Sequence, residues 1–186
     1  MTRSIGEGLD QALEQAQTRP IPKSAGAQMR FLVRQMKSTR AVAQMLRVSQ
    51  RTVERYVKDQ IKRPRADLAA RMEREVTKRW QPKVKERAKK AAGTSQGLVV
   101  DVRAQLGYDA PAGTSDEARM RHLTVALPPH QAARLFDAQG QGANDAALQK
   151  ITADALKEVY FQQRGTRAAS LEEVRMLNLE HIEFGL

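Results

Sequence analysis

The chain has 186 residues, and its 32 Lys and Arg against 21 Asp and Glu give a net charge of +11. This length allows one medium domain or two small ones, and the charge favours a polyanionic partner. The absence of cysteine excludes disulfides and zinc–thiolate sites, and no apolar run is long enough to span a membrane. We therefore expect a cytoplasmic protein that associates with DNA.

The positive charge is concentrated in the first half of the chain. Residues 1–96 hold 23 Lys and Arg against 9 Asp and Glu, a net charge of +14, whereas residues 97–186 hold 9 against 12, a net charge of −3. Because clustered basic side chains bind phosphates, we expect the first half to bind nucleic acid and the second half to have another role.

The first half has the pattern of a helical domain. Apolar residues recur at helical spacing, and the pattern is interrupted at Arg19–Lys23 and at Arg63–Pro64. The predicted helical segments are 1–18, about 25–37, about 39–61 and about 67–90. Their apolar positions include Ile5, Leu9, Leu13, Met29, Leu32, Leu68, Met72 and Val76.

The segment 39–61 has the pattern of a helix-turn-helix motif. A short first helix is followed by a turn at Arg47 and Val48, and Ser49 is a suitable N-cap for a second helix from about Gln50 to Ile61. The pattern departs from the usual one at Arg47, because glycine favours the left-handed backbone of this turn. The alternative is an ordinary helical domain with a basic surface.

If the motif binds DNA, its second helix and the residues after it supply the contacts to base edges and phosphates. The candidates are Gln50, Arg51, Thr52, Arg55, Lys58, Arg63 and Arg65. A second candidate group lies in the basic run 78–90 and comprises Lys83, Lys85, Arg87 and Lys89. This run is either a second phosphate-binding segment or a solvated helix face.

The second half has the pattern of an α+β domain. After a predicted linker at 91–97, residues 98–106 and 122–127 resemble strands, and a helix is expected from Pro128–Pro129. Asn144 is suited to cap a long helix, and the end of the chain alternates like a strand. The predicted fold is thus α+β, with a helical DNA-binding domain at 1–90, the linker at 91–97 and an α+β domain at 98–186.

A short segment between the first two predicted strands contains two adjacent hydroxyl groups, on Thr114 and Ser115. Pro111 and Gly113 favour an exposed turn, and the acidic residues at 116–117 suit the first turn of a following helix. By composition alone, this segment is a loop with a helix N-cap.

The chain as a whole resembles the terminal proteins of linear Streptomyces chromosomes and plasmids, which are often called telomere proteins. The resemblance rests on the overall length and on the segments GEGLDQAL (6–13), VSQRTVERY (48–56), RHLTVALPP (121–129) and SLEEVR (170–175). It implies that the chain is bound covalently to 5′ DNA ends. It also implies that a side-chain hydroxyl primes the polymerase that fills the gap opposite a 3′ overhang. The implied partners are telomeric DNA, a telomere-associated protein and a DNA polymerase.

Given this resemblance, Thr114 is the preferred priming residue, because a primer hydroxyl must be exposed and flanked by small residues. Ser115 is the second choice, followed by Thr94, Ser95 and Tyr108. The divalent metal ions and the deoxynucleotide belong to the polymerase site, so we expect no intrinsic cofactor. The chain would be a substrate and primer, not an enzyme.

Two other classes of protein share these sequence features. One is a helix-turn-helix transcription regulator with a C-terminal dimerisation domain, and the other is a nucleoid-associated or partition protein. Covalent attachment of a nucleotide distinguishes the terminal protein from both.

Overall fold

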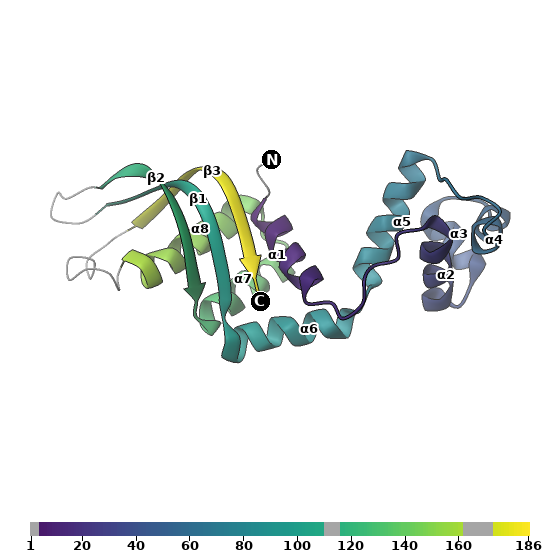
Figure 1. Ribbon diagram of the computed structural model, residues 1–186, viewed down its shortest axis with the longest axis horizontal. Helices are drawn as coiled ribbons and strands as arrows, with labels where there is room; N and C mark the ends of the chain where they lie inside the picture. Colours follow the sequence, from purple (N-terminus) through teal and green to yellow (C-terminus); the bar gives the residue numbers. More distant parts are fainter. Residues whose placement is uncertain (1–3, 110–115, 162–172) are drawn as a thin grey trace. The chain divides into compact units, whose positions relative to one another are not determined.

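A computed structural model describes residues 4–109, 116–161 and 173–186. Its fold is α+β, with helices early in the chain and a small antiparallel sheet after them (Figure 1). The chain divides into two compact units: Met1–Gln17 with Lys83–Leu186 form unit 1, and Thr18–Pro82 form unit 2. Each unit has its own hydrophobic core. The predicted α+β class is therefore confirmed.

Unit 2 consists of four helices, α2 (Ala25–Met36), α3 (Thr39–Leu46), α4 (Gln50–Val57) and α5 (Ala66–Arg79). Helix α2 packs against each of the other three. Their apolar faces meet in one core, because the predicted helical spacing places the buried side chains on one side of each helix. This core includes Met29, Leu32, Val42, Leu46, Val53, Leu68, Met72 and Val76.

Serine side chains define the starts of three of these helices. Ser24, Ser38 and Ser49 accept hydrogen bonds from backbone amides in the first turns of α2, α3 and α4, at 3.3, 3.2 and 3.1 Å respectively. Such caps satisfy amides that have no partner within the helix, and each contributes about 1 kcal/mol. The predicted capping role of Ser49 is confirmed.

Two predicted helices end earlier than expected. Helix α4 ends at Val57 and not near Ile61, because Asp59 has a left-handed backbone with φ of 55°. The expected basic helix at 67–90 is two helices, α5 and α6 (Pro82–Ala91), separated at Trp80 and Gln81. Because proline disfavours helical backbone at the preceding residue, Pro82 accounts for the break, and Gln81 is also left-handed with φ of 46°.

Unit 1 contains a three-stranded antiparallel sheet in the order β2-β1-β3. The strands are β1 (Leu98–Asp109), β2 (Asp116–Leu127) and β3 (Glu173–Gly185). The central strand pairs Val100 with Val125 on one side and with Phe184 on the other. A bulge in β3 shifts the register, because Arg103 pairs with His181 but Gln105 pairs with Leu177.

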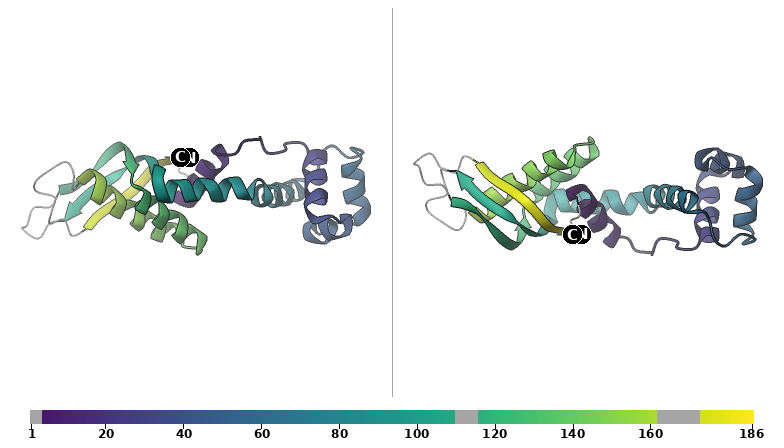
Figure 2. Two further views of the ribbon diagram at one scale, coloured as in Figure 1. Left: turned by 90° about the horizontal axis from the view of Figure 1, so that it is seen from below. Right: turned by 90° about the horizontal axis from the view of Figure 1, so that it is seen from above.

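Helices α7 (Pro129–Gly140) and α8 (Asp145–Leu156) form a second layer against one face of this sheet (Figures 1 and 2). Asn144 caps α8 by accepting a hydrogen bond from Ala147 at 2.9 Å, as predicted. A π-helical turn, η2 (Lys157–Phe161), continues α8 and contacts β2. We call the sheet face directed away from these helices the outer face.

Helix α1 (Ile5–Gln15) belongs to unit 1, although the sequence placed it in the DNA-binding domain. Its predicted apolar residues Ile5, Leu9 and Leu13 are buried, but they contribute to the core beneath the sheet. The Asp145 carboxylate at the start of α8 accepts a hydrogen bond from the Ile5 amide at 2.7 Å. The lack of a side chain at Gly8 allows α1 to lie close to the Phe184 ring of β3.

The segment expected to be a linker at 91–97 is structured. A π-helical turn, η1 (Ala92–Gln96), buries Ala92 and packs against α7, and Gly97 has a positive φ of 76° beside the Leu127 carbonyl. The residues at 116–117 were expected to begin a helix, but they begin strand β2. Beyond a shift of register after Leu106, Asp116 of β2 pairs with Tyr108 of β1.

Candidate nucleic-acid interface

Helices α3 and α4 are connected by a short turn formed by Arg47, Val48 and Ser49. Arg47 has φ of 54° and ψ of 48°, the left-handed backbone that glycine adopts most easily. The Val48 amide donates a hydrogen bond to the Ala43 carbonyl at 2.9 Å. Buried side chains on both helices, including that of Val53, hold the pair together. The turn therefore forms with arginine at the position where the helix-turn-helix pattern favours glycine.

The outward side of α4 is basic. Arg51, Arg55 and Lys58 are exposed; the first two lie one turn apart on α4, and Lys58 directly follows the last residue of the helix. We call these three residues the basic stripe. Gln50 is also exposed and donates a hydrogen bond to the Glu54 carboxylate at 2.9 Å, whereas the Thr52 hydroxyl lies 2.8 Å from that of Ser49.

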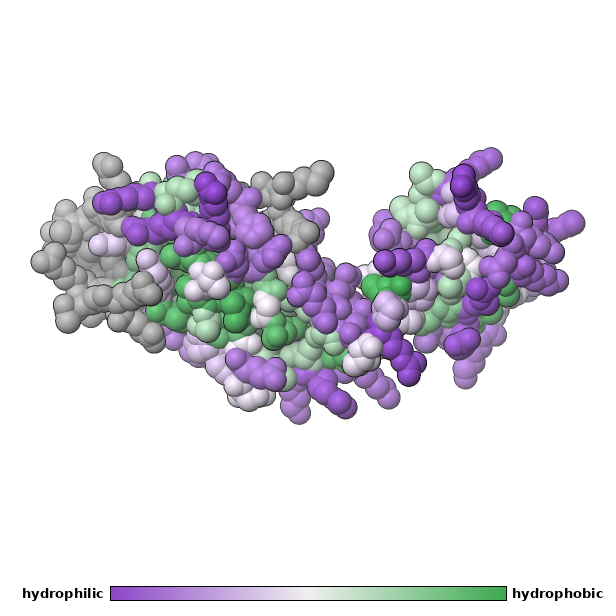
Figure 3. All heavy atoms as spheres, in the orientation of Figure 1, coloured by the Kyte–Doolittle hydropathy of each residue, from purple (hydrophilic) through white to green (hydrophobic). Residues whose placement is uncertain are grey.

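Unit 2 has a far stronger positive charge than the rest of the chain. It contains 17 Lys and Arg against 5 Asp and Glu, so its net charge is +12 and that of unit 1 is −1. Hydrophilic side chains cover the side of this unit where α3 and α4 lie (Figure 3). Arg63 and Arg65 are exposed in the segment between α4 and α5. The candidate contacts from Gln50 to Arg65 thus belong to one unit.

The four candidate residues of α6 belong to unit 1. Lys83 and Arg87 are exposed, whereas Lys85 is half-buried. The Lys89 ammonium lies 5.9 Å from the centre of the Phe136 ring and 4.0 Å from the Glu86 carboxylate. Lys89 therefore packs against its own unit, as a cation beside an aromatic ring.

The preferred priming hydroxyls, those of Thr114 and Ser115, lie outside the described residues. The Thr94 hydroxyl donates a hydrogen bond to the Lys90 carbonyl at 2.8 Å, and the Ser95 hydroxyl donates to the Ala91 carbonyl at 3.3 Å. The half-buried Tyr108 ring packs edge to face on Phe161, with 5.8 Å between the ring centres. Each of these three alternative residues thus has a side-chain contact within its own unit.

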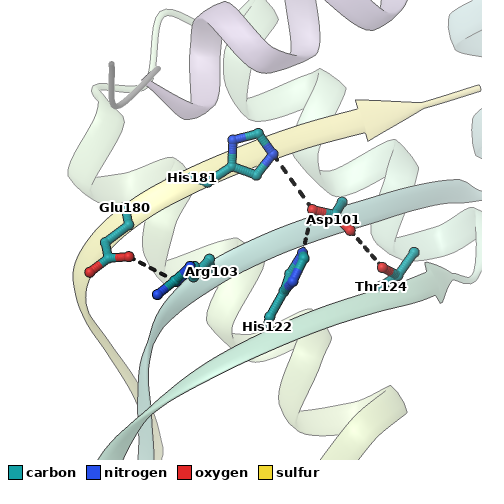
Figure 4. A network of polar contacts seen from close by, with 6 residues as sticks. All are labelled: Asp101, Arg103, His122, Thr124, Glu180 and His181. Atoms are coloured by element: carbon teal, nitrogen blue, oxygen red, sulfur yellow. Dashed lines mark hydrogen bonds and ion pairs between the residues drawn. The ribbon is translucent and has the colours of Figure 1, made fainter.

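A network of polar residues occupies the outer face of the sheet (Figure 4). The Asp101 carboxylate accepts a hydrogen bond from the Thr124 hydroxyl at 2.6 Å. The Nε2 atoms of His122 and His181 lie 2.9 and 3.5 Å from one oxygen of this carboxylate. Strand alternation fixes the face on which each residue lies, but only the pairing register brings side chains of the three strands together, so the sequence did not predict this network.

Hydrogen bonding stabilises the ionised form of Asp101. Its pKa is lowered first by the Thr124 hydroxyl and then by His122, and these contributions outweigh the opposing effect of burial. The pKa of Glu158 in η2 is lowered in the same way, first by Gln131 and then by His130. Both carboxylates therefore contribute to local structure as anions at neutral pH.

Among residues 4–109, 116–161 and 173–186, no cluster of His, Asp and Glu is arranged to hold a metal ion. In the same part of the chain, no helix has the length and apolar composition needed to cross a membrane. Comparisons with protein-family models, with curated protein sequences and with solved structures found no match to this chain.

Proposed function

We propose that unit 2 is a helix-turn-helix domain that binds duplex DNA through α4. The observation that supports this most directly is the basic stripe of α4, which follows a tight left-handed turn in a unit with a net charge of +12. An α-helix fits the major groove, where its N-terminal residues reach base edges. In this arrangement Gln50 and Arg51 are base-contacting residues, and Arg63 and Arg65 are phosphate-contacting residues.

We infer further that the chain is a terminal protein of linear replicons, as its resemblance to the Streptomyces telomere proteins implies. Thr114 would then be the residue that is linked to the 5′ end of the DNA. It lies in the segment between β1 and β2, which pair from Leu98 with Leu127 to Tyr108 with Asp116. This hairpin supports the proposal, because the residues that flank the segment containing Thr114 lie at the same end of two paired strands.

In the priming reaction, the Thr114 hydroxyl oxygen attacks the α-phosphorus of a deoxynucleoside triphosphate. A phosphoester bond to the side chain forms, the bond between the α- and β-phosphates breaks, and pyrophosphate leaves. The hydroxyl proton passes to a base or water in the polymerase, whose divalent metal ions stabilise the developing charge. A telomere-associated protein would bring the chain to the telomeric 3′ overhang.

The test is covalent labelling of the full chain with a radioactive α-labelled deoxynucleotide, a template with a 3′ overhang and a DNA polymerase. We expect the wild-type chain and Thr114→Ser to be labelled, and Thr114→Ala to remain unlabelled while binding DNA normally. Thr94→Ala is the matched control, since it removes a hydroxyl that already has a helical partner, and it should retain the label.

Peptide mapping of the labelled chain locates the linkage. Label on Ser115 moves the site by one residue and leaves the reaction unchanged. If the wild-type chain binds DNA but is never labelled, the priming role is excluded, and a helix-turn-helix transcription regulator becomes the better description.

A further inference from the structure

The C-terminal end of α4 is held against α2 by three residues. One guanidinium nitrogen of Arg30 in α2 donates a hydrogen bond to the Val57 carbonyl at 3.0 Å and another to the Asp59 carboxylate at 2.6 Å. The Val57 carbonyl lies in the last turn of α4, where backbone carbonyls lack helical partners and a cation is favoured. Arg30 thus joins α2 both to the end of α4 and to the turn that follows it.

Gly26 makes this arrangement possible. It lies one helical turn before Arg30, and a Cβ atom at this position would be 1.9 Å from an Asp59 carboxylate oxygen. Any larger residue must therefore shift the Asp59 carboxylate, whose other oxygen accepts the hydrogen bond from Arg30. The left-handed backbone of Asp59 directs the chain away from α4 at the same point. We call Gly26, Arg30 and Asp59 the latch.

We propose that the latch is a positioning device that fixes the orientation of α4 for sequence-specific DNA binding. This inference rests on the proposed role of α4 in DNA binding. Helix α4 has only eight residues and is about 12 Å long, so the way its two ends are held helps to set its direction, together with the packing of its buried Val53. The Ser49 cap and the α3–α4 turn hold one end, and the latch holds the other.

Because the latch is exposed, its effect on DNA recognition can be distinguished from its effect on folding stability. The Arg30 and Asp59 side chains are 42% and 57% exposed, and exposed ion pairs contribute little to folding stability. Base recognition is more demanding, because hydrogen bonds need donor–acceptor distances of about 3 Å and weaken steeply once their angles fall below about 120°. Loss of the latch should therefore weaken sequence discrimination more than it weakens the fold.

The experiment compares two single substitutions in the full chain, Asp59→Ala and Asp67→Ala. Both remove an aspartate that is paired with an arginine in unit 2, so both raise the charge of the unit by one. The charge change alone should leave DNA binding unchanged or make it tighter. Asp59→Ala also breaks the latch, whereas Asp67 forms its pair within α5. Arg30 itself is left intact, because its removal would also eliminate a cation.

Each variant is titrated with two duplexes of equal length. One is a sequence selected by the wild-type chain from a random pool, and the other has a scrambled sequence. We expect Asp59→Ala to lower the ratio of selected to scrambled affinity by roughly three- to tenfold, while Asp67→Ala leaves this ratio unchanged. Thermal melts by circular dichroism check that both variants are folded.

Gly26→Ala provides an independent break of the latch. It should reduce the affinity ratio as Asp59→Ala does, although alanine favours the helix more than glycine. The double variant Gly26→Ala/Asp59→Ala should have the same affinity ratio as Asp59→Ala alone. Alanine at position 59 already removes the carboxylate that the methyl group of Ala at position 26 would displace.

The outcomes separate the two proposals. If the wild-type chain prefers its selected duplex and both latch variants keep the wild-type ratio, the latch inference is overturned and the proposed function stands. If the wild-type chain binds neither duplex, the proposed DNA-binding function fails, and the latch inference fails with it.

Discussion

Arg47 occupies the position in the α3–α4 turn where side chain and backbone are in conflict. Its left-handed backbone, with φ of 54°, places Cβ close to the following carbonyl and costs roughly 1–2 kcal/mol for residues other than glycine. The sequence indicated this conflict, because the helix-turn-helix pattern requires a left-handed residue there. The buried contacts of α3 and α4 enforce the conformation.

We therefore expect Arg47→Gly to be more stable than Arg47→Ala by about 1 kcal/mol in free energy of unfolding. Both variants lose the arginine side chain, so the difference between their free energies of unfolding reports the cost of the left-handed backbone. Urea denaturation of the two variants measures it. Equal stabilities would contradict a left-handed backbone at this residue.

The sequence predicts residue contacts that are local, but not those between distant segments. Ser49 was recognisable as an N-cap because the residues that define a cap lie within four positions of one another. The Arg30–Asp59 pair joins residues 29 positions apart, and the contacts of Asp101 join three strands. Such partners depend on helix packing and strand register, which the spacing of apolar residues does not specify.

At the scale of elements, the apolar periodicity predicted most helices and strands near their observed positions. It missed the break at Trp80–Gln81 because apolar spacing continues up to Trp80, and the basic composition is continuous across it. It also merged α4 with the residues after it, because no glycine or proline marks the left-handed turn at Asp59. The apolar pattern thus located the elements better than it located their ends.

We expect the arginines of the basic stripe to contribute to DNA affinity beyond their charge. Arg51→Ala and Arg55→Ala should each weaken binding to the selected duplex by about 1–3 kcal/mol if the lost contact is bidentate to a base. Arg74→Ala, at an exposed arginine of α5, is the control for loss of one charge and should have a smaller effect. Fluorescence anisotropy at fixed salt measures all three. Equal losses would show that α4 contributes only non-specific charge.

At the scale of the whole molecule, the structure shows a division into units that the sequence did not predict. Unit 2 is inserted between α1 and the rest of unit 1, and α1 contributes to the core beneath the sheet. The two ends of unit 2 are joined, because the Thr18 amide donates a hydrogen bond to the Gln81 side chain at 3.0 Å. No local pattern identifies such an insertion, since the periodicity of α1 is the same whichever core it enters.

This organisation predicts that the two units unfold separately. The chain's single tryptophan, Trp80, packs on Phe31 with 4.9 Å between ring centres and donates a hydrogen bond to the Arg19 carbonyl. All three residues belong to unit 2, so tryptophan fluorescence reports the unfolding of this unit alone. Circular dichroism reports the helices of both units.

Unit 2 is the smaller unit, and smaller domains generally bury a smaller fraction of their surface, so we expect it to unfold at the lower urea concentration. Circular dichroism should then show two transitions, and fluorescence should follow only the first. Adding the selected duplex should move the fluorescence transition to higher urea by mass action and leave the second transition in place, because the ligand binds folded unit 2. A single transition detected identically by both probes would show that the chain unfolds as one cooperative body, contrary to its division into two units.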